Sequence, residues 1–231
     1  LVLNLNAQRF VTSVFSTIQK DTSIVYGNAD YWDSGGTFGT GVDNPEDITL
    51  DLYQPPASDT MQKRPLVIAI FGGAFMKGSP DRPDIVAWCD SLAHYGYVAA
   101  AIDYRIGFNP AGSGGTTGPD MGLKRAAWRA IQDGRASVRF FKEMHDTYNI
   151  DTNQIFVLGN SAGAITAFHV GYMNSDEWIP EAGAQAGGLT PNNVDLGCID
   201  CSTSLPGHYN HSVDVAGIIS LWGATLDLNY I

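Results

Sequence analysis

Four short and almost uninterrupted apolar runs recur along the chain, and each is bounded by residues that favour turns. They cover residues 66–71, 97–102, 154–158 and 215–221. Apolar runs of this length are typical of parallel strands that are covered on both faces by helices. The runs therefore predict a parallel sheet that is buried above and below.

Helical patterns lie between these runs, over residues 82–95, 122–148 and 162–173. In the second pattern, small and apolar residues recur at steps of three and four: Ala127, Ile131, Gly134, Val138 and Phe141. This spacing predicts one face that packs against the sheet, with Arg129, Arg135 and Lys142 pointing outward. The alternation of strands and helices predicts right-handed parallel crossovers.

The remaining segments complete the expected fold. Residues 48–53 alternate apolar and polar side chains, as a half-exposed antiparallel strand does, and residues 22–26 are expected to pair with them as an edge hairpin. Residues 108–119 match no element, and residues 174–211 form a long insertion before the last apolar run. We therefore expect one α/β domain over residues 1–231, with a mostly parallel sheet and helices on both faces.

Composition limits the classes of partner. The chain has 231 residues and a formal net charge of −11, and it contains no run of Lys and Arg. This charge argues against nucleic acid as a partner, because phosphate backbones are bound by clusters of basic residues. No apolar stretch reaches the length of about 18 residues that a membrane span requires, so none is expected.

The N-terminus and the cysteines bear on the compartment. Residues 1–8 are apolar residues that lead to a small one, which fits either the end of a secretory signal peptide or an apolar first strand. Cys89 lies in an apolar helical pattern and is expected to be a buried thiol. Cys198 and Cys201 lie close together in a polar loop and are expected to form a disulfide if the protein is exported. The expected localisation is secreted or in the cell envelope, as in the periplasm.

The pentapeptide at residues 159–163 reads Gly-Asn-Ser-Ala-Gly. A serine nucleophile on a strained turn between a strand and a helix needs small residues two positions before and after it. An apolar strand leads into Ser161 and a helical pattern leads out, so the context fits this turn. The backbone N–H of Ala162 would then lie at a helix N-terminus and donate to an oxyanion. The alternative is an ordinary tight turn between strand and helix.

A second motif, Phe-Gly-Gly-Ala-Phe, follows the first buried strand directly, at residues 71–75. Two small residues in such a turn expose backbone N–H groups to a bound carbonyl. Gly73 and Ala74 are the expected donors, and together with Ala162 they would complete an oxyanion hole. The alternative is a glycine turn that serves close packing alone.

The two motifs, their connecting elements and the Asp-Tyr-Arg run at residues 103–105 resemble the α/β-hydrolase esterases and lipases. The resemblance is greatest to the carboxylesterase and hormone-sensitive-lipase-like groups, and it covers residues 45–231. It implies hydrolysis of carboxylic esters through an acyl-enzyme, without a metal or an organic cofactor. Phe71 departs from the usual His or Tyr, which bears on the support of the turn. We interpret residues 103–105 as structural, with Arg105 bracing a loop near the site.

Ser161 needs a base and an acid, and the resemblance places both after it, in the order Ser, Asp or Glu, His. Neither expected position falls before Ile231, so we expect the C-terminal strands and the two residues beyond residue 231, on a continuation or a second polypeptide. Asp227 is a weaker candidate for the acid. The five histidines are interpreted as packing or surface residues, although the two in the long insertion could approach the site: His94, His145, His169, His208 and His211.

Other interpretations stay open at this point. The spacing of Cys198, Cys201, His208 and His211 would also suit zinc, although the histidine spacing is short and a disulfide is preferred. Three aromatic residues are candidates for the substrate pocket or for the core: Phe75, Phe108 and Trp178. The expected substrate is a small-molecule or polymeric ester. The alternatives are a peptidase, amidase or polymer hydrolase on the same fold, or a binding protein that has lost its triad.

Overall fold

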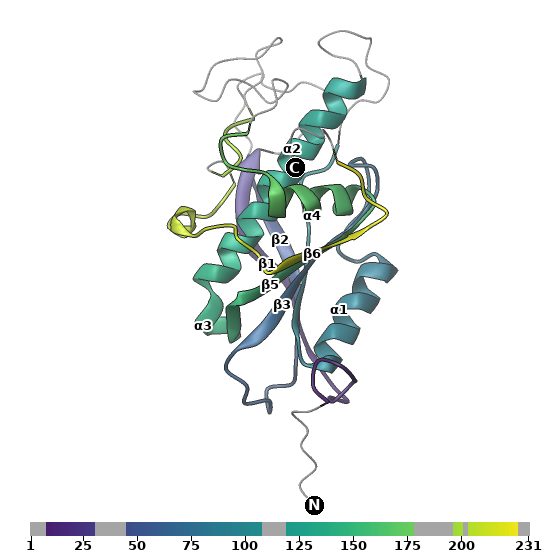
Figure 1. Ribbon diagram of the computed structural model, residues 1–231, viewed down its shortest axis with the longest axis vertical. Helices are drawn as coiled ribbons and strands as arrows, with labels where there is room; N and C mark the ends of the chain where they lie inside the picture. The colour runs from purple at the N-terminus through teal and green to yellow at the C-terminus, as the bar shows by residue number, and fades with distance from the viewer. Residues whose placement is uncertain (1–7, 31–44, 108–118, 178–195, 201–202, 226–231) are drawn as a thin grey trace, which may run out of the picture.

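The computed structural model describes residues 8–30, 45–107, 119–177, 196–200 and 203–225. Its core is a six-stranded sheet in the order β1-β2-β4-β3-β5-β6 (Figure 1). The strands are β1 (Gln19–Asp30), β2 (Pro45–Gln54), β3 (Arg64–Ile70), β4 (Val98–Ile102), β5 (Ile150–Asn160) and β6 (Gly217–Leu221).

The pairing confirms a mostly parallel sheet with an antiparallel edge. β3 pairs in parallel with β4 and β5, and β5 pairs in parallel with β6. β1 pairs antiparallel with β2, and β2 pairs antiparallel with β4. The edge hairpin expected from residues 22–26 and 48–53 is therefore present, and both of its strands are longer than the sequence pattern indicated.

Helices cover both faces of the sheet. They are α1 (Pro83–Tyr95), α2 (Pro119–Glu143), α3 (His145–Tyr148) and α4 (Ala162–Tyr172). α1 lies on one side of the sheet and α2 on the other in Figure 1, and α2 packs against α4. In the part of the chain that is described, no helix is long and apolar enough to cross a lipid bilayer.

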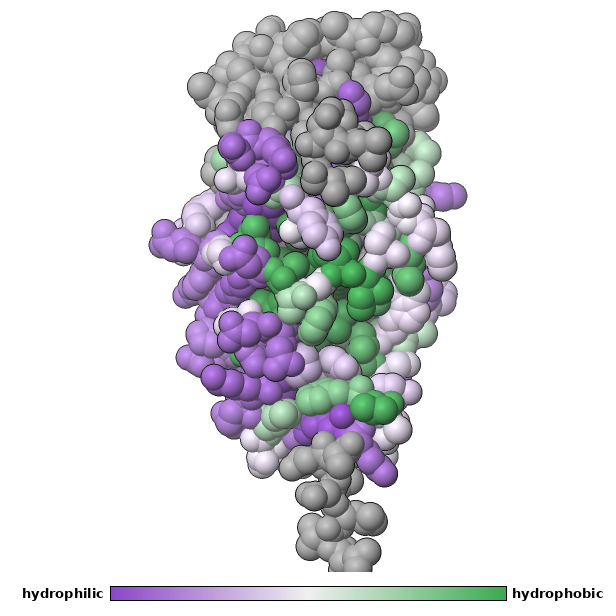
Figure 2. Space-filling model, viewed as in Figure 1, coloured by the Kyte–Doolittle hydropathy of each residue, from purple (hydrophilic) through white to green (hydrophobic). Residues whose placement is uncertain are grey.

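β3 and β4 are buried as predicted, whereas β5 is buried only in part and β6 is not buried. Every residue of β3 and β4 is buried, which fits their continuous apolar runs. β6 is only half-buried, because among the described residues it pairs with β5 alone. Ile219 and Trp222 are exposed at this edge, and Figure 2 shows apolar side chains gathered in the middle of the same face of the molecule.

The predicted outward face of α2 is wrong at two of its three positions. Arg129 and Arg135 are buried, at 1% and 3% exposure. For Arg135 the reason is a second layer, because residues 196–200 and 203–212 lie along α2 and contact it. Arg129 instead donates to the carbonyl of Gly107 in the connection after β4. Arg135 donates to both carboxylate oxygens of Asp200 at 2.7 and 2.9 Å, and Arg139 donates to the same group. Lys142, at the end of the helix, is half-buried.

The same segment also reaches the first strand. Ser204 forms an isolated antiparallel bridge with Gly27 of β1, and the N–H of Asn28 donates to the carbonyl of Thr203. The long insertion is therefore not a loose loop in its described part. It returns across α2 to the edge of the sheet, far in sequence from β1, and it includes a short 3-10 helix, His208–Asn210.

Candidate functional site

Ser161 occupies the turn between β5 and α4 with φ 51° and ψ −119°. This is a costly conformation for a residue with a side chain, and such strain clusters at functional sites. The serine is exposed, whereas Asn160 before it and Ala162 after it are buried. The turn thus presents a single hydroxyl at the carboxyl end of the sheet, where α/β folds place their ligands.

The two glycines of the motif are required by close backbone contacts. A Cβ atom on Gly159 would lie 2.1 Å from the carbonyl oxygen of Gly163, and a Cβ atom on Gly163 would lie 2.1 Å from that of Ile70. Larger residues would push α4 away from β5 or from the end of β3. The spacing seen in the sequence is therefore explained by the packing of the turn.

The turn at residues 71–75 lies directly beside the serine. A Cβ atom on Gly72 would come within 3.0 Å of the Cβ atom of Ser161. Gly73 has φ 144°, and a Cβ atom there would lie 1.7 Å from the carbonyl oxygen of Lys77. Ala74 and Phe75 also have positive φ, of 55° and 58°. The turn has positive φ at three consecutive residues, and at Ala74 and Phe75, which carry side chains, this conformation is strained, again next to Ser161.

Three backbone N–H groups around the serine are available to a ligand. Those of Gly73, Ala74 and Ala162 donate to no backbone carbonyl among the described residues. The N–H of Ala162 lies in the first turn of α4, where helical N–H groups have no intrahelical acceptor and the helix dipole favours negative charge. The arrangement can bind an oxyanion that forms on a carbonyl attacked by Ser161.

Two polar contacts fix the serine turn from outside. The Ser161 N–H donates to the carbonyl of Leu221 at 3.0 Å, which ties the turn to the end of β6. The Asn160 side chain donates to Asp84 at 2.6 Å, in the first turn of α1. Burial alone would raise the pKa of Asp84, but Arg82 and the other donors outweigh it and hold the pKa below its usual value. The sequence analysis gave no role to Asn160, which holds the turn through Asp84. Its place directly before the serine could have indicated such a role.

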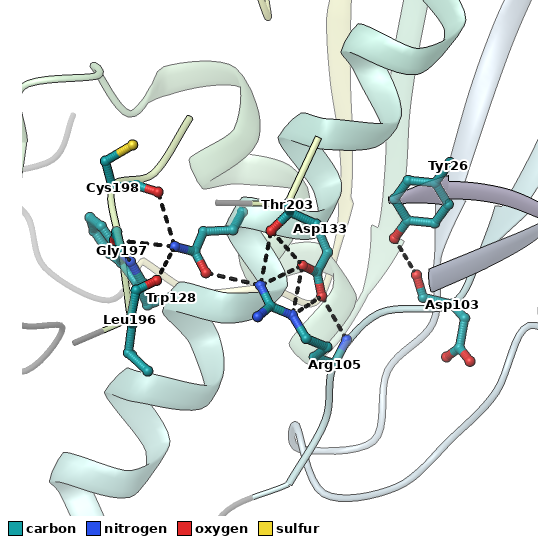
Figure 3. A network of polar contacts seen from close by, with 10 residues as sticks. Tyr26, Asp103, Arg105, Trp128, Asp133, Leu196, Gly197, Cys198 and Thr203 are labelled. Carbon is teal, nitrogen blue, oxygen red and sulfur yellow. Dashed lines mark hydrogen bonds and ion pairs between the residues drawn. The ribbon is translucent and has the colours of Figure 1, made fainter. Parts of the chain in front are cut away.

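The run at residues 103–105 follows β4, and Figure 3 shows Arg105 of this run meeting Asp133 of α2. Arg105 forms an ion pair with Asp133 at 2.7 Å and donates to Thr203 at 3.0 Å, so it holds a loop as the sequence predicted. Burial raises the pKa of Asp103 to about 6, because its carboxylate is partly removed from water near other acids. Tyr104 donates to the carbonyl of Phe71 at 2.9 Å. The sequence indicated a structural run but gave no role to this tyrosine.

No described histidine contacts Ser161, and all five histidines of the chain are described. In three of the histidines, Nδ1 forms a hydrogen bond with a backbone carbonyl oxygen. The partners are Phe15 for His94, Lys142 for His145 and Ile165 for His169. His211 contacts Glu143 at 2.6 Å, and His208 packs against Phe140.

A hollow of about 550 Å³ has His211 in its wall together with Thr152 and Asn153, near the start of β5. That is the end of β5 opposite Ser161. The two insertion histidines therefore do not approach the serine, and the possibility that they do is wrong.

The remaining predicted residues fall into three groups. Phe75 is buried in the core, at 2% exposure, and Cys89 is a buried free thiol as expected. Cys198 is disulfide-bonded. Asp227, Phe108, Trp178 and Cys201 lie outside the described residues. Within the described part of the chain, no group of three or more His, Cys, Asp or Glu side chains could hold a metal ion.

Comparison with known proteins shows a consistent set of relatives. The BD-FAE family model matches residues 50–229. The chain is 30% identical over 117 residues to gut esterase 1 of Caenorhabditis elegans, which covers 51% of this chain and 19% of that protein. It is 30% identical over 120 residues to carboxylesterase 3B of Mus musculus, covering 51% of this chain and 19% of that protein.

A lipase and a solved structure complete the comparison. Lipase 5 of Diutina rugosa is 25% identical over 126 residues, covering 53% of this chain and 22% of that protein. The butyrate-bound esterase Est2 of Thermogutta terrifontis superposes with a TM-score of 0.52 at 20% identity, over 77% of this chain and 49% of that chain. This likeness shows the α/β-hydrolase fold. The chain spans about a fifth of the length of the three curated relatives and about half of the structural one.

Proposed function

The chain belongs to the BD-FAE family of α/β-hydrolase esterases, and on that premise we propose that it hydrolyses carboxylic esters through an acyl-enzyme on Ser161. The observation that carries the proposal is the exposed serine, held at φ 51° beside a turn with free backbone N–H groups. A turn that served packing alone would not need its only exposed side chain to be a hydroxyl.

The proposed reaction has two halves. The Ser161 Oγ attacks the ester carbonyl carbon while a histidine base takes the hydroxyl proton. The oxyanion accepts hydrogen bonds from the N–H groups of Gly73, Ala74 and Ala162. Collapse of the tetrahedral intermediate expels the alcohol, which takes the proton from the histidine. Water then attacks the acyl group with the same base, and the acid leaves while Ser161 regains its proton.

The proposed reaction needs a base that Ser161 does not find among the described histidines. The five histidines all lie away from Ser161, so we propose that a histidine beyond residue 231 serves, on a continuation of the chain or a second polypeptide. The acid that orients it is a further carboxylate there, with Asp227 as the alternative. The proposed substrates are small-molecule or polymeric esters.

The disulfide at Cys198 supports a proposal about the compartment. Disulfides persist in oxidising environments and are rare in the cytosol. Cys198 is disulfide-bonded, and the segment that carries it packs on α2 through backbone carbonyls that accept from Gln132. We propose that the protein works as a secreted or cell-envelope enzyme.

The test compares the full-length protein with its Ser161→Ala variant on p-nitrophenyl acetate. We expect the variant to lose about 10⁴-fold or more in kcat, because removal of a serine nucleophile leaves only residual catalysis. A fluorophosphonate probe should label the unmodified protein on Ser161, as peptide mapping would show. The matched control is Ser175→Ala, which removes another exposed serine close after α4 and should leave turnover unchanged.

Three other outcomes would contradict the proposal. Turnover that survives Ser161→Ala would place the nucleophile elsewhere. Unmodified protein with neither turnover nor label would favour a binding protein without a working triad. Faster cleavage of matched p-nitroanilides than of esters would favour an amidase or peptidase.

A further inference from the structure

Tyr104 is buried directly after β4 and reaches the turn at residues 71–75. Its hydroxyl donates to the carbonyl oxygen of Phe71 at 2.9 Å. Its ring stacks on that of Phe71 with centroids 4.3 Å apart, and it meets the ring of Phe75 edge-on at 6.5 Å. One side chain therefore contacts both ends of the turn that carries two candidate oxyanion donors.

The carbonyl of Phe71 lies where three elements meet. A Cβ atom on Gly163 would lie 2.6 Å from this oxygen, so the oxygen is placed between the Tyr104 hydroxyl and the first turn of α4. At the other end of the turn, the N–H of Gly107 donates to the carbonyl of Phe75 at 2.6 Å. The connection after β4 thus holds the turn at two points, and one of them adjoins the helix that carries the third donor.

We propose that Tyr104 is a positioning residue that orients the turn at residues 71–75, so that the N–H groups of Gly73 and Ala74 point to the same oxyanion as that of Ala162. The inference rests on the proposed function. Phe71 occupies a position where the resembling esterases carry His or Tyr, and here its ring is held between Tyr104 and the backbone of Gly78. Orientation of the turn is therefore assigned to a side chain from the neighbouring strand.

Loss of this hydrogen bond should affect the transition state more than substrate binding. Oxyanion donors bind the charged tetrahedral oxygen more strongly than the neutral carbonyl, so a displaced donor lowers kcat with little change in KM. Burial also raises the pKa of Tyr104, so its hydroxyl stays protonated and remains a donor throughout the range of an ordinary assay. The loss of rate should accordingly be independent of pH.

The test is Tyr104→Phe in the full-length protein, because phenylalanine keeps the stacked ring and removes only the hydroxyl. The matched control is Tyr26→Phe. Tyr26 is also fully buried and donates to a backbone carbonyl of the same connection, that of Asp103 at 2.5 Å. Among the described contacts, the turn at residues 71–75 meets Tyr104 and not Tyr26. Both variants lose one buried hydrogen bond, so the free energy of unfolding should fall similarly in both.

The kinetic results should differ between the two. We expect Tyr104→Phe to lower kcat about 10-fold or more with KM nearly unchanged, since complete loss of one oxyanion donor costs roughly 100-fold to 1,000-fold. Tyr26→Phe should keep the kcat of the unmodified protein. 4-Aminophenylalanine at position 104 restores a donor on the same ring and should recover most of the rate, and it keeps the test decisive if Tyr104→Phe folds poorly.

Several results would overturn the inference. The inference fails, while the proposed function stands, if the unmodified protein is active and labelled on Ser161 and the Tyr104→Phe variant has the same kcat. It also fails if Tyr26→Phe loses as much kcat as Tyr104→Phe, if KM alone rises, or if 4-aminophenylalanine gives no recovery. Unmodified protein that is inactive and unlabelled would sink the proposed function first, and this inference with it.

Discussion

Helix α2 contacts the segment that follows residue 195 at two places, and the two contacts differ in burial. In the middle of the helix, Asp133, Arg135 and Arg139 are buried beneath that segment. In its last turn, Lys142 and Glu143 meet the same segment at the surface, where Lys142 donates to Ser212 and Glu143 contacts His211. Polar contacts of similar length thus join one helix to one segment in two different environments, with Arg135 bound to Asp200 at 2.7 Å and Glu143 to His211 at 2.6 Å.

The buried contact includes a charge pair with a third part of the chain, because Asp133 of α2 pairs with Arg105 in the connection after β4 and also contacts Thr203 of the segment. Asp133 has no exposed side-chain surface, and it accepts hydrogen bonds from the backbone and guanidinium of Arg105 at 2.7 to 3.1 Å and from Thr203 at 3.3 Å. Placing two charges in such a site is costly, and the site is stable only while every partner remains. Removing the charge of Asp133 takes away the carboxylate that Arg105 contacts at 2.7 Å in this buried site.

At the surface contact, water can take the place of the hydrogen bond between the two side chains. The side chains of Glu143 and His211 are 47% and 33% exposed, although their atoms are only 2.6 Å apart. Exposed ion pairs gain little, because water solvates both charges once they separate and salt screens them. We therefore expect the exposure of the carboxylate, and not the distance between the charged atoms, to set how much each contact contributes to stability.

The largest effect is expected from Asp133→Asn. This change keeps the shape of the side chain but removes the Asp133 carboxylate charge from the buried Arg105 guanidinium, so the free energy of unfolding should fall by about 3–5 kcal/mol. Urea unfolding followed by circular dichroism would measure it. The control is Asp176→Asn, an exposed carboxylate after α4, which should change nothing. A loss for Asp133→Asn as small as that of the control would break the comparison.

A smaller effect is expected from Asp200→Asn. The Asp200 side chain is 30% exposed and pairs with Arg135 and Arg139, so water can partly solvate the two guanidinium groups after the change. The expected loss is about 2 kcal/mol, the range of a hydrogen bond to a charged group. The same unfolding measurement applies, and a loss equal to that of Asp133→Asn would show that exposure does not set the order.

The contribution of Asp200 should also depend on pH. Burial alone would raise the pKa of this carboxyl, but the hydrogen bonds and charges of Arg135 and Arg139 outweigh it and lower the pKa. A lowered pKa in the folded state gives stability that is complete above the unfolded value of about 3.9 and is lost as the pH falls toward the folded value. The difference between the unmodified protein and Asp200→Asn should therefore be constant near pH 7 and shrink below about pH 5.

The sequence predicted the sheet and the position of the candidate serine because both depend on local signals. Continuous apolar runs identify buried parallel strands. The two glycine-containing turns directly follow the apolar runs of β3 and β5 in the sequence, so their places at the ends of these strands could be predicted. Gly73, Gly159 and Gly163 are required by close approaches between neighbouring backbones, so a motif of small residues was enough to place them. β6 was predicted to be as buried as β3 because its composition is similar, but its burial depends on what lies beside it.

The charged face of α2 could not be predicted in the same way. Helical periodicity shows which side of a helix is apolar, and it assumes that the opposite side faces water. Arg135 and Arg139 contradict this because a segment about 65 residues further along the chain covers them. Arg129 is buried as well, and it donates to the carbonyl of Gly107 in the connection after β4. The partners, Asp200 and Ser204, lie in a polar stretch without any periodic pattern. Such a contact is set by tertiary packing, which a single sequence does not reveal.

The smallest effect on the free energy of unfolding is expected from Glu143→Gln, which removes the carboxylate of the exposed contact. His211 donates to Glu143 and lowers its pKa, but the carboxylate stays in water, so we expect no measurable change in unfolding at pH 7. The measurement should be repeated at about 1 M salt, where the Debye length is roughly 3 Å, and both proteins should again agree. A clear loss at low salt that disappears at high salt would mean that the exposed contact also holds the segment on α2. Exposure of the carboxylate would then no longer separate the two contacts.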